Sequence, residues 1–274
     1  MKRFTIREEA DLKEFLATVL SVSKGKAKEL IDTRTVFVNS QRVWIASHRL
    51  HRNDVVEVAD PSAATARRNP KFDVLYEDDS LIAVNKPPGV VCDEDAHSVE
   101  VLLRQVRGIP ELQAIHRLDQ DTSGVFLLAK NRAAFERGKA LWQRELVEKS
   151  YRVICLRPAR FRSTEVRLPV DGKRAVSRVT LLKKAHGYSY FQVDALTGRK
   201  HQVRLHLGAI GHPIVGDKQY GPRVIADPIL KGVARQMLHC ARIVLPAMAG
   251  GRQLQITAPL PGDFRHLARR LGLL

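Results

Sequence analysis

The sequence predicts an α+β protein in which a small α/β domain precedes a larger domain. That larger domain is built on a mixed, mainly antiparallel sheet with flanking helices. From about residue 73, many short apolar runs are separated by turns, and helical patterns occur only occasionally. Strands and helices therefore do not alternate as they do in a doubly wound fold. A chain of 274 residues has room for one large domain and one small one.

Residues 1–58 are expected to form the small domain. A first helix is predicted by apolar residues that recur at helical spacing, at Leu12, Phe15, Leu16, Val19 and Leu20. Ser23 is placed to cap a second helix, whose apolar positions are Ala27, Leu30 and Ile31. Three short strands are expected after it, at residues 36–38, 42–45 and 55–58, with a polar turn at 39–41.

Residues 59–72 have the composition of a linker, because they are small, polar and interrupted twice by proline. The larger domain is then expected over residues 73–274. Two helices are predicted within it, at 133–146 and 200–210, and Gly211 followed by Pro213 would end the second one. Strands are predicted at residues 81–85, 125–129, 151–156, 178–182, 190–194 and 254–257.

The charge of the chain indicates a polyanionic partner. Lys and Arg number 46 against 29 acidic residues, which gives a net charge of +17 and a pI near 10.2. Such a field attracts polyanions, and nucleic acid is the first class to consider. An anionic membrane surface is the second, but no basic amphipathic helix or lipidation motif supports it. Residues 1–58 hold 11 basic and 8 acidic residues, so both domains carry part of the excess.

The sequence also bears on where the protein works. No apolar run approaches the roughly 20 residues of a membrane span. The first residues lack the apolar core of a secretion signal, so a cytoplasmic protein is expected. Cys92, Cys155 and Cys240 lie far apart and form no CxxC pair, which is typical of reduced thiols in the cytosol.

A first candidate for chemistry is the segment His116-Arg-Leu-Asp-Gln-Asp-Thr-Ser-Gly124. Its Thr-Ser-Gly end is typical of a turn, and an apolar strand follows at once. A loop that leads into a rigid strand is a common place for catalytic groups. Asp119 has cationic neighbours in His116 and Arg117, although an exposed turn carboxylate would look the same.

A second candidate is Thr197-Gly-Arg-Lys-His-Gln-Val-Arg204, at the start of a predicted helix. Free backbone N–H groups and the positive end of the helix dipole favour an anion there, either a phosphate or a carboxylate that must remain ionised. A solvated basic helix end is the alternative interpretation.

Metal and hydrolase chemistry have weak support. His201 and His206 are five residues apart and do not share one helix face as an i, i+4 pair does. No GxSxG or HExxH motif occurs. A magnesium-dependent nuclease could use the acids Asp78, Asp79, Asp119 and Asp121, but paired acids beside Ser80 are more often a solvated turn.

These segments resemble the motifs of one enzyme family. His116-Arg-Leu-Asp-x-x-Thr-Ser-Gly and the segment from Thr197 to Arg204 are similar to two signatures of the RluA-type pseudouridine synthases. Further similarities, in family order, are 76–89 ending in Lys86-Pro-Pro-Gly, Lys149-Ser-Tyr, 211–217, Tyr220-Gly and Leu238-His-Cys-Ala. Residues 4–58 resemble a small RNA-binding domain of the ribosomal protein S-four type. Arg34, in place of a turn glycine, and Lys200, in place of threonine, depart from the family patterns.

The resemblance implies isomerisation of uridine to pseudouridine in structured RNA, by a monomer without a cofactor, nucleotide or metal. Asp119 would be the catalytic carboxylate, Arg204 would pair with it, and Tyr151 would stack on the uracil. His116, Arg117 and Lys86 would contact the substrate RNA. Three roles are open to Asp119: attack at carbon 6 of the base, attack at carbon 1′ of the sugar, or removal of a sugar proton.

Two other classes remain as alternatives. A non-catalytic RNA-binding or ribosome-assembly factor would need the basic surface but not Asp119, Tyr151 and Arg204 together. A metal-dependent nuclease would lose its activity in EDTA. Among RNA targets, ribosomal RNA of the large subunit is favoured over transfer RNA, on the strength of the N-terminal module and the high charge.

Overall fold

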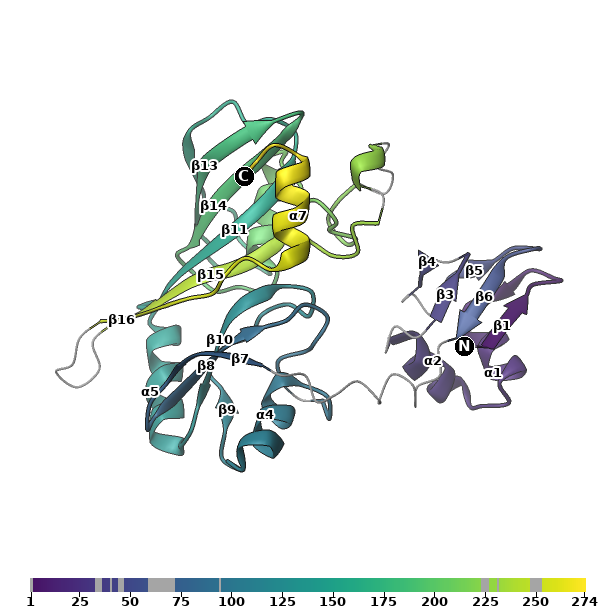
Figure 1. Ribbon diagram of the computed structural model, residues 1–274, viewed down its shortest axis with the longest axis horizontal. Helices are drawn as coiled ribbons and strands as arrows, with labels where there is room; N and C mark the ends of the chain where they lie inside the picture. The colour runs from purple at the N-terminus through teal and green to yellow at the C-terminus, as the bar shows by residue number, and fades with distance from the viewer. Residues whose placement is uncertain are drawn as a thin grey trace. The chain divides into compact units, whose positions relative to one another are not determined.

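The computed structural model describes residues 2–32, 36–39, 41–43, 47–58, 72–93, 95–222, 227–230, 232–246 and 253–274. The chain divides into two compact units, Met1–Lys71 and Phe72–Leu274 (Figure 1). The predicted fold class is confirmed: the second unit is built on a large, mostly antiparallel sheet with helices packed on it, and the first is a small α/β unit.

The first unit has a four-stranded sheet of order β1-β6-β3-β4, a separate strand pair, β2-β5, and two helices. The Asp11 side chain accepts a hydrogen bond from the Lys13 N–H at 3.1 Å at the start of the first helix. Ser23 caps the second helix as predicted, because its Oγ accepts from the Lys26 N–H at 3.1 Å. The elements are β1 (Lys2–Thr5), β2 (Ala10–Asp11), α1 (Leu12–Val19), α2 (Lys24–Asp32), β3 (Val36–Val38), β4 (Gln41–Arg42), β5 (Arg49–Leu50) and β6 (Val55–Val58).

Some expectations for this region fall outside the described residues. They concern Arg34, the end of the strand expected at 42–45 and most of the linker expected at 59–72. Phe72 is described, and it differs from the expectation. Its side chain is buried and packs in the core of the second unit, so the linker does not extend to this residue.

The second unit is organised around a sheet of order β12-β13-β14-β11-β15-β10-β8-β7, with β16 paired to β15 and β9 to β10. Neighbouring strands are antiparallel except at the centre, where β10 and β15 run parallel and place Ser123 opposite His239. The strands are β7 (Asp73–Glu77), β8 (Leu81–Lys86), β9 (Gln113–Ala114), β10 (Ser123–Ala129), β11 (Glu148–Leu156), β12 (Ser163–Val166), β13 (Ser177–Ala185), β14 (Tyr188–Ala195), β15 (Leu238–Leu245) and β16 (Leu254–Thr257).

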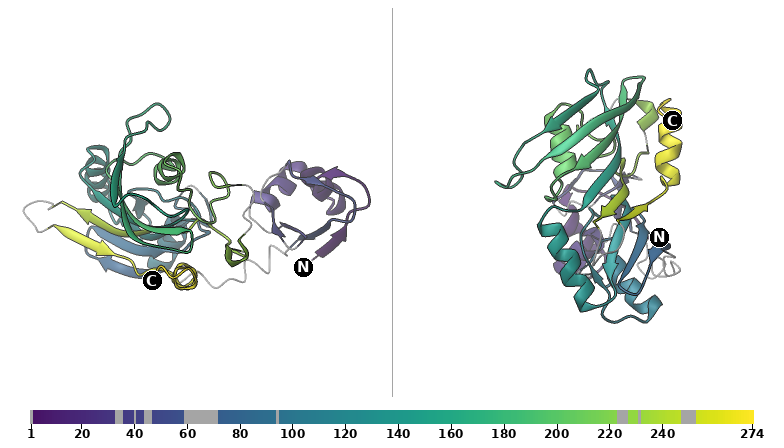
Figure 2. Two further views of the ribbon diagram at one scale, coloured as in Figure 1. Left: turned by 90° about the horizontal axis from the view of Figure 1, so that it is seen from above. Right: turned by 90° about the vertical axis from the view of Figure 1, so that its left-hand side faces the viewer.

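Two helices cover opposite faces of one half of this sheet, as Figure 2 shows: α6 (Gln202–Ala209) and α7 (Gly262–Arg270). Successive residues of a strand point to opposite faces. Val153 therefore packs with Val203 of α6, whereas its neighbour Ile154 packs with Phe264 of α7. Both faces of the second half of β11 are apolar for this reason, and residues 153–156, Val-Ile-Cys-Leu, form a continuous hydrophobic run.

The other half of the sheet carries α4 (Val99–Arg107) and α5 (Arg132–Gln143), with a short 3₁₀ turn, η1 (Pro228–Leu230), elsewhere in the unit (Figure 1). Ser98 and Asn131 cap the two helices, since their side chains accept from the third N–H that follows. Strand β8 is almost wholly buried and all seven residues of β10 are buried, whereas the edge strand β7 is largely accessible. The segment that enters β10 is therefore attached to a rigid support.

The two predicted helices of this unit are confirmed, with shifted ends. Helix α5 stops at Gln143 because Glu145 has a φ of 56°, and α6 begins at Gln202 because His201 has a φ of 56°. The predicted end at Gly211 is confirmed: the Gly211 N–H donates to the Gly208 carbonyl and the His212 N–H to the Leu207 carbonyl, which is a Schellman motif. No helix in the described part of the chain is both long and apolar enough to cross a membrane.

Candidate active site

Asp119 lies in the turn that joins β9 to β10. The Thr122 N–H donates to the Asp119 carbonyl at 2.9 Å and closes this turn immediately before the buried strand begins. The Asp119 side chain is about one-fifth exposed, at 21%. The carboxylate is therefore held by a rigid strand and still open to solvent on one side.

Arg204 of α6, which is 85 residues further along the chain, contacts this carboxylate. Its Nη1 donates to Asp119 Oδ2 at 3.0 Å. Its other edge is held by Asp217, to which Nε donates at 2.7 Å and Nη2 at 2.9 Å. One guanidinium thus connects two carboxylates, of which Asp217 is buried and Asp119 is partly open. The pairing expected between Asp119 and Arg204 is present in the structure.

The charges of this group reinforce one another. Burial works against the positive charge of Arg204, but hydrogen bonds from its guanidinium to Asp217 and the charges of both carboxylates hold its pKa above the ordinary value. Burial likewise disfavours ionised Asp217, yet the Arg204 hydrogen bonds and the N–H groups of Gln219 and Tyr220 hold its pKa below the ordinary value. Both groups are accordingly charged at neutral pH.

Asp217 was quoted from the sequence only within the family segment 211–217, and no role was assigned to it. Its side chain is 1% exposed and accepts four hydrogen bonds. An aspartate in an apolar segment, Pro213-Ile-Val-Gly-Asp217, was the available signal, because a carboxylate that is buried needs a cation.

Tyr151 lies in β11, opposite Cys240 of β15, at a point where the register of the two strands shifts. Its ring is half-buried between two apolar clusters. Burial raises the pKa of the Tyr151 hydroxyl well above its ordinary value, and the charge of Asp119 adds to the shift. The phenol is therefore neutral, and it lies within electrostatic reach of the Asp119 carboxylate.

His201 and Tyr220 complete the surroundings of Asp119, and neither was singled out from the sequence as a site residue. Nδ1 of His201 is 2.8 Å from the Tyr220 hydroxyl, and Nε2 is 3.7 Å from Asp119 Oδ1. Burial lowers the pKa of His201, against the opposing charge of Asp119. The guanidinium carbon of Arg204 lies 4.8 Å from the centre of the Tyr220 ring, a cation–π contact.

Two of the expected substrate contacts are placed differently. Lys86 is fully buried, and its Nζ donates to the carbonyls of Pro87 and Gln120, each at 2.9 Å. Burial lowers its pKa to about 8. His116 is also buried: its ring stacks on Trp142 at 4.4 Å, and Nε2 accepts from the Leu127 N–H at 3.1 Å. Burial lowers the pKa of His116 to about 3, so it is a neutral core residue.

The third expected contact, Arg117, lies at the surface, and its role stays a prediction. Its side chain is 66% exposed, and its Nε lies 3.3 Å from Asp93 Oδ1. Lys86, at the end of β8, and His116 are buried, whereas Arg117, the residue after His116, is exposed.

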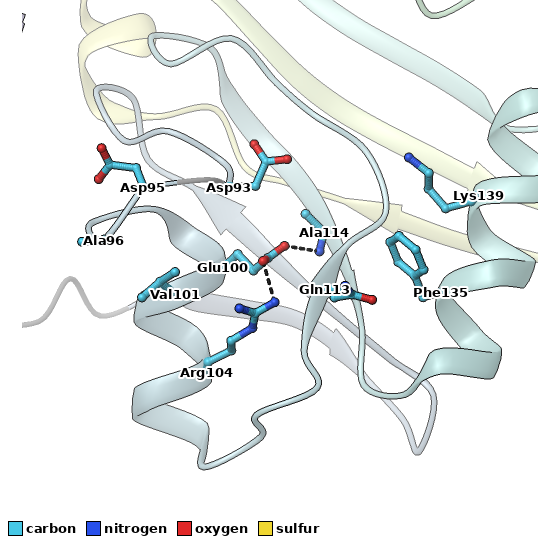
Figure 3. A pocket seen from close by; sticks show the side chains of 10 residues that line it. All are labelled: Asp93, Asp95, Ala96, Glu100, Val101, Arg104, Gln113, Ala114, Phe135 and Lys139. Carbon is cyan, nitrogen blue, oxygen red and sulfur yellow. Dashed lines mark hydrogen bonds and ion pairs between the residues drawn. The ribbon is translucent and has the colours of Figure 1, made fainter.

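A pocket of about 490 Å³ lies on the same unit, and Asp93 also lines it. Figure 3 shows side chains from α4, α5 and the segment 113–114 around it, with Glu100 bound to Arg104 and to the Ala114 N–H. Asp119 is not among its lining residues. Within the ranges that the model describes, no group of three or more His, Cys, Asp or Glu side chains could hold a metal ion, so the nuclease quartet is not assembled.

Comparisons with known proteins identify the family of this chain. Residues 80–209 match the model of the RNA pseudouridylate synthase family. The chain is 30% identical to the ribosomal large subunit pseudouridine synthase D of Pseudomonas aeruginosa, over 72% of this chain and 71% of that protein. It is 28% identical to the ribosomal large subunit pseudouridine synthase C of Vibrio cholerae, over 92% of this chain and 89% of that protein.

A solved structure shows the same fold. The human RNA pseudouridylate synthase domain containing 4 superposes with a TM-score of 0.61 at 24% identity, covering 77% of this chain and 95% of that one. The family match and these relatives place the chain among the RNA-modifying isomerases. The chain belongs to the RNA pseudouridylate synthase family, in its RluA-type branch, and is an RNA pseudouridine synthase.

Proposed function

We propose that this enzyme converts one or more uridines of large-subunit ribosomal RNA to pseudouridine, with Asp119 as the catalytic carboxylate. The observation that carries the proposal is the 3.0 Å contact between Arg204 Nη1 and Asp119 Oδ2 at a carboxylate that is 21% exposed. The Pseudomonas and Vibrio relatives are pseudouridine synthases of the large ribosomal subunit, which supports the choice of RNA.

The reaction breaks the bond between N1 of uracil and carbon 1′ of ribose, and it forms a bond from carbon 5 to carbon 1′. Carbon 5 loses a proton and N1 gains one, so no oxidant, reductant or co-substrate is needed. An ionised carboxylate is required as nucleophile or base. Arg204 serves this need, since a guanidinium beside a carboxylate favours its charged form and fixes its orientation.

Tyr151 is proposed to hold the uracil while the ring turns. A detached base must expose carbon 5 to the sugar without leaving the site. Stacking on an aromatic face tolerates rotation in the plane of the ring. The neutral phenol, half-buried and within reach of the Asp119 charge, provides such a face.

The basic surface is proposed to provide RNA affinity. A uridine in a stacked or paired strand must be extruded before its glycosidic bond can be reached, at a cost of a few kcal/mol. Phosphate contacts of Lys and Arg offset this cost. We assign Arg117 to such a contact, and residues 1–58 to an RNA-binding domain of the ribosomal protein S-four type. Lys86 and His116 are left out of this role because both are buried.

Two experiments test the proposal. Asp119→Ala should abolish tritium release from RNA labelled at uracil carbon 5 while RNA binding survives, and full turnover by this variant would reject the assignment. Pseudouridine mapping in cells that lack the protein should show loss at large-subunit ribosomal positions. An unchanged ribosomal map with a loss in transfer RNA would overturn the substrate and leave the chemistry in place.

A further inference from the structure

We propose that Arg235 is a positioning residue, which fixes the turn carrying Asp119 and anchors it to the C-terminal helix α7. This inference rests on the proposed role of Asp119. Arg235 lies in the segment before β15, its side chain is 6% exposed, and neither the family motifs quoted above nor the pairing of Asp119 with Arg204 involves it.

The guanidinium of Arg235 is held on one edge by a carboxylate of α7. Nε donates to Asp263 Oδ2 at 2.7 Å, and Nη2 donates to Asp263 Oδ1 at 3.0 Å. A two-bonded pair of this kind fixes the plane of the guanidinium as well as its position. Asp263 lies in the first turn of α7, so the orientation of Arg235 depends on where this helix begins.

The remaining edge of the guanidinium binds backbone carbonyls. Nη1 donates to the Asp121 carbonyl at 3.2 Å, to the Gln236 carbonyl at 3.0 Å and, more weakly, to the Leu238 carbonyl at 3.4 Å. Asp121 is two residues beyond Asp119, within the same turn. Arg235 therefore ties this turn to the start of β15, a segment more than 100 residues later in the chain.

The neighbouring residue extends the same connection to the carboxylate itself. The Gln236 side chain is buried, and its Nε2 donates to Thr122 Oγ1 at 3.1 Å and lies 3.5 Å from Asp119 Oδ2. The backbone of Arg235 also lies against Gly216: a Cβ on Gly216 would come within 2.0 Å of the Arg235 carbonyl oxygen. The segment 235–236 thus contacts both Asp119 and Gly216, the residue before Asp217.

A rotation of the Asp119 turn would break bonds that this buried cation cannot replace with water. The carboxylate must face both Arg204 and the substrate, and a displacement of about 1 Å at a reacting group can cost about 100-fold in rate. The geometry therefore predicts that the loss of the Arg235 fork slows the chemical step more than it weakens RNA binding.

The test is single-turnover tritium release by the full-length protein with labelled RNA. Arg235→Lys keeps the charge but cannot form the two-bonded fork. Asp263→Asn removes the charge of the α7 anchor at a half-exposed position. We expect both variants to lose rate, by up to about 100-fold, with RNA affinity unchanged. The double variant should be no slower than Arg235→Lys, because the two changes remove one connection.

Arg104→Lys is the matched control. Arg104 also binds a carboxylate, that of Glu100, and a backbone carbonyl, that of Leu112, but neither partner belongs to the Asp119 turn. This variant should keep the wild-type rate. Wild-type rates in folded Arg235→Lys and Asp263→Asn overturn the positioning role, as does a change confined to KM. If Arg235→Lys does not fold, the rate of Asp263→Asn decides. Because Asp119→Ala is measured alongside, its activity reports on the proposed function separately.

Discussion

Asp119 and Asp217 are bound by the same guanidinium, that of Arg204, yet their side chains differ in exposure, 21% against 1%. The buried carboxylate compensates the charge of Arg204 and fixes its direction. The Asp119 carboxylate accepts one hydrogen bond from Arg204 and is partly exposed to solvent. The carboxylate proposed to be catalytic is thus the exposed one of two chemically identical groups, and the buried one holds their shared cation.

Arg204→Lys should lower the rate of pseudouridine formation by about 100-fold while RNA binding is retained. Lysine can neutralise one carboxylate, but it cannot bridge two of them with fixed geometry. Tritium release and RNA binding are the two measurements. Arg178→Lys, at an exposed pair with Glu165, is the control and should behave as wild type. A fully active Arg204→Lys enzyme would contradict the bridging role.

Asp217→Asn should destabilise the second unit by about 3–5 kcal/mol, because it leaves a buried guanidinium short of its principal counter-charge. Urea denaturation measures this loss. Glu165→Gln removes a carboxylate from a surface ion pair and should cost less than about 1 kcal/mol. Equal stabilities of the two variants would show that Asp217 is not the main partner of Arg204.

Tyr151→Leu should slow turnover more than Tyr151→Phe does. Phenylalanine keeps the stacking face, whereas leucine removes it, and stacking of a base on an aromatic ring is worth about 1–3 kcal/mol. Because burial holds the pKa of Tyr151 well above its ordinary value, the hydroxyl is not an available base at neutral pH. Single-turnover rates of both variants measure the difference. Equal losses in the two would point to the hydroxyl instead of the ring.

The pH dependence of stability should reflect His116. Burial lowers its pKa from 6.5 to about 3, so below pH 6.5 the unfolded chain binds a proton that the folded chain does not. The contribution of neutral His116 to the free energy of unfolding is therefore complete above pH 6.5. It is lost as the pH falls from 6.5 towards 3, by up to about 1.4 kcal/mol per pH unit. His116→Gln should remove this part of the slope in urea titrations between pH 6.5 and 4. A slope that is the same in His116→Gln as in the wild type would contradict this origin of the pH dependence.

Arg117→Ala should weaken RNA binding and reduce its salt dependence. Each phosphate contact contributes about one counterion to the slope of log K against log salt, so the slope should fall by about one. RNA affinity at several salt concentrations gives this slope. Arg104→Ala, at a group already bound to Glu100 and Leu112, should leave it unaltered. An unaltered slope in Arg117→Ala would remove Arg117 from the RNA interface.

Much of the fold was accessible from local patterns. The spacing of Leu12 and Leu16, the cap at Ser23 and the helix end at Gly211 are short-range signals, and the structure confirms the elements that they predict. Helices α4 and α7 were missed, although Phe264, Leu267 and Leu271 follow helical spacing. The pairing of Asp119 with Arg204 was reached through family motifs and not through composition.

The burial of polar groups was not accessible in this way. Lys86 and His116 are polar residues next to other polar residues in the sequence. Their burial results from the strands that pack around them in the folded protein. Asp217 and Arg235 were overlooked for the same reason, since their partners are distant in sequence. Local sequence reports which side chains could carry charge, whereas tertiary packing determines which of them meet solvent.

The parallel pairing of β10 with β15 has a consequence for how the enzyme becomes active. Ser123 and His239, bonded at 2.9 Å between Oγ and Nδ1, are 116 positions apart, and such non-local contacts form slowly. The turn bearing Asp119 gains its contacts with Gln236 only once this pairing exists. A nascent chain can therefore complete the contacts of this turn only after most of its second unit has been synthesised.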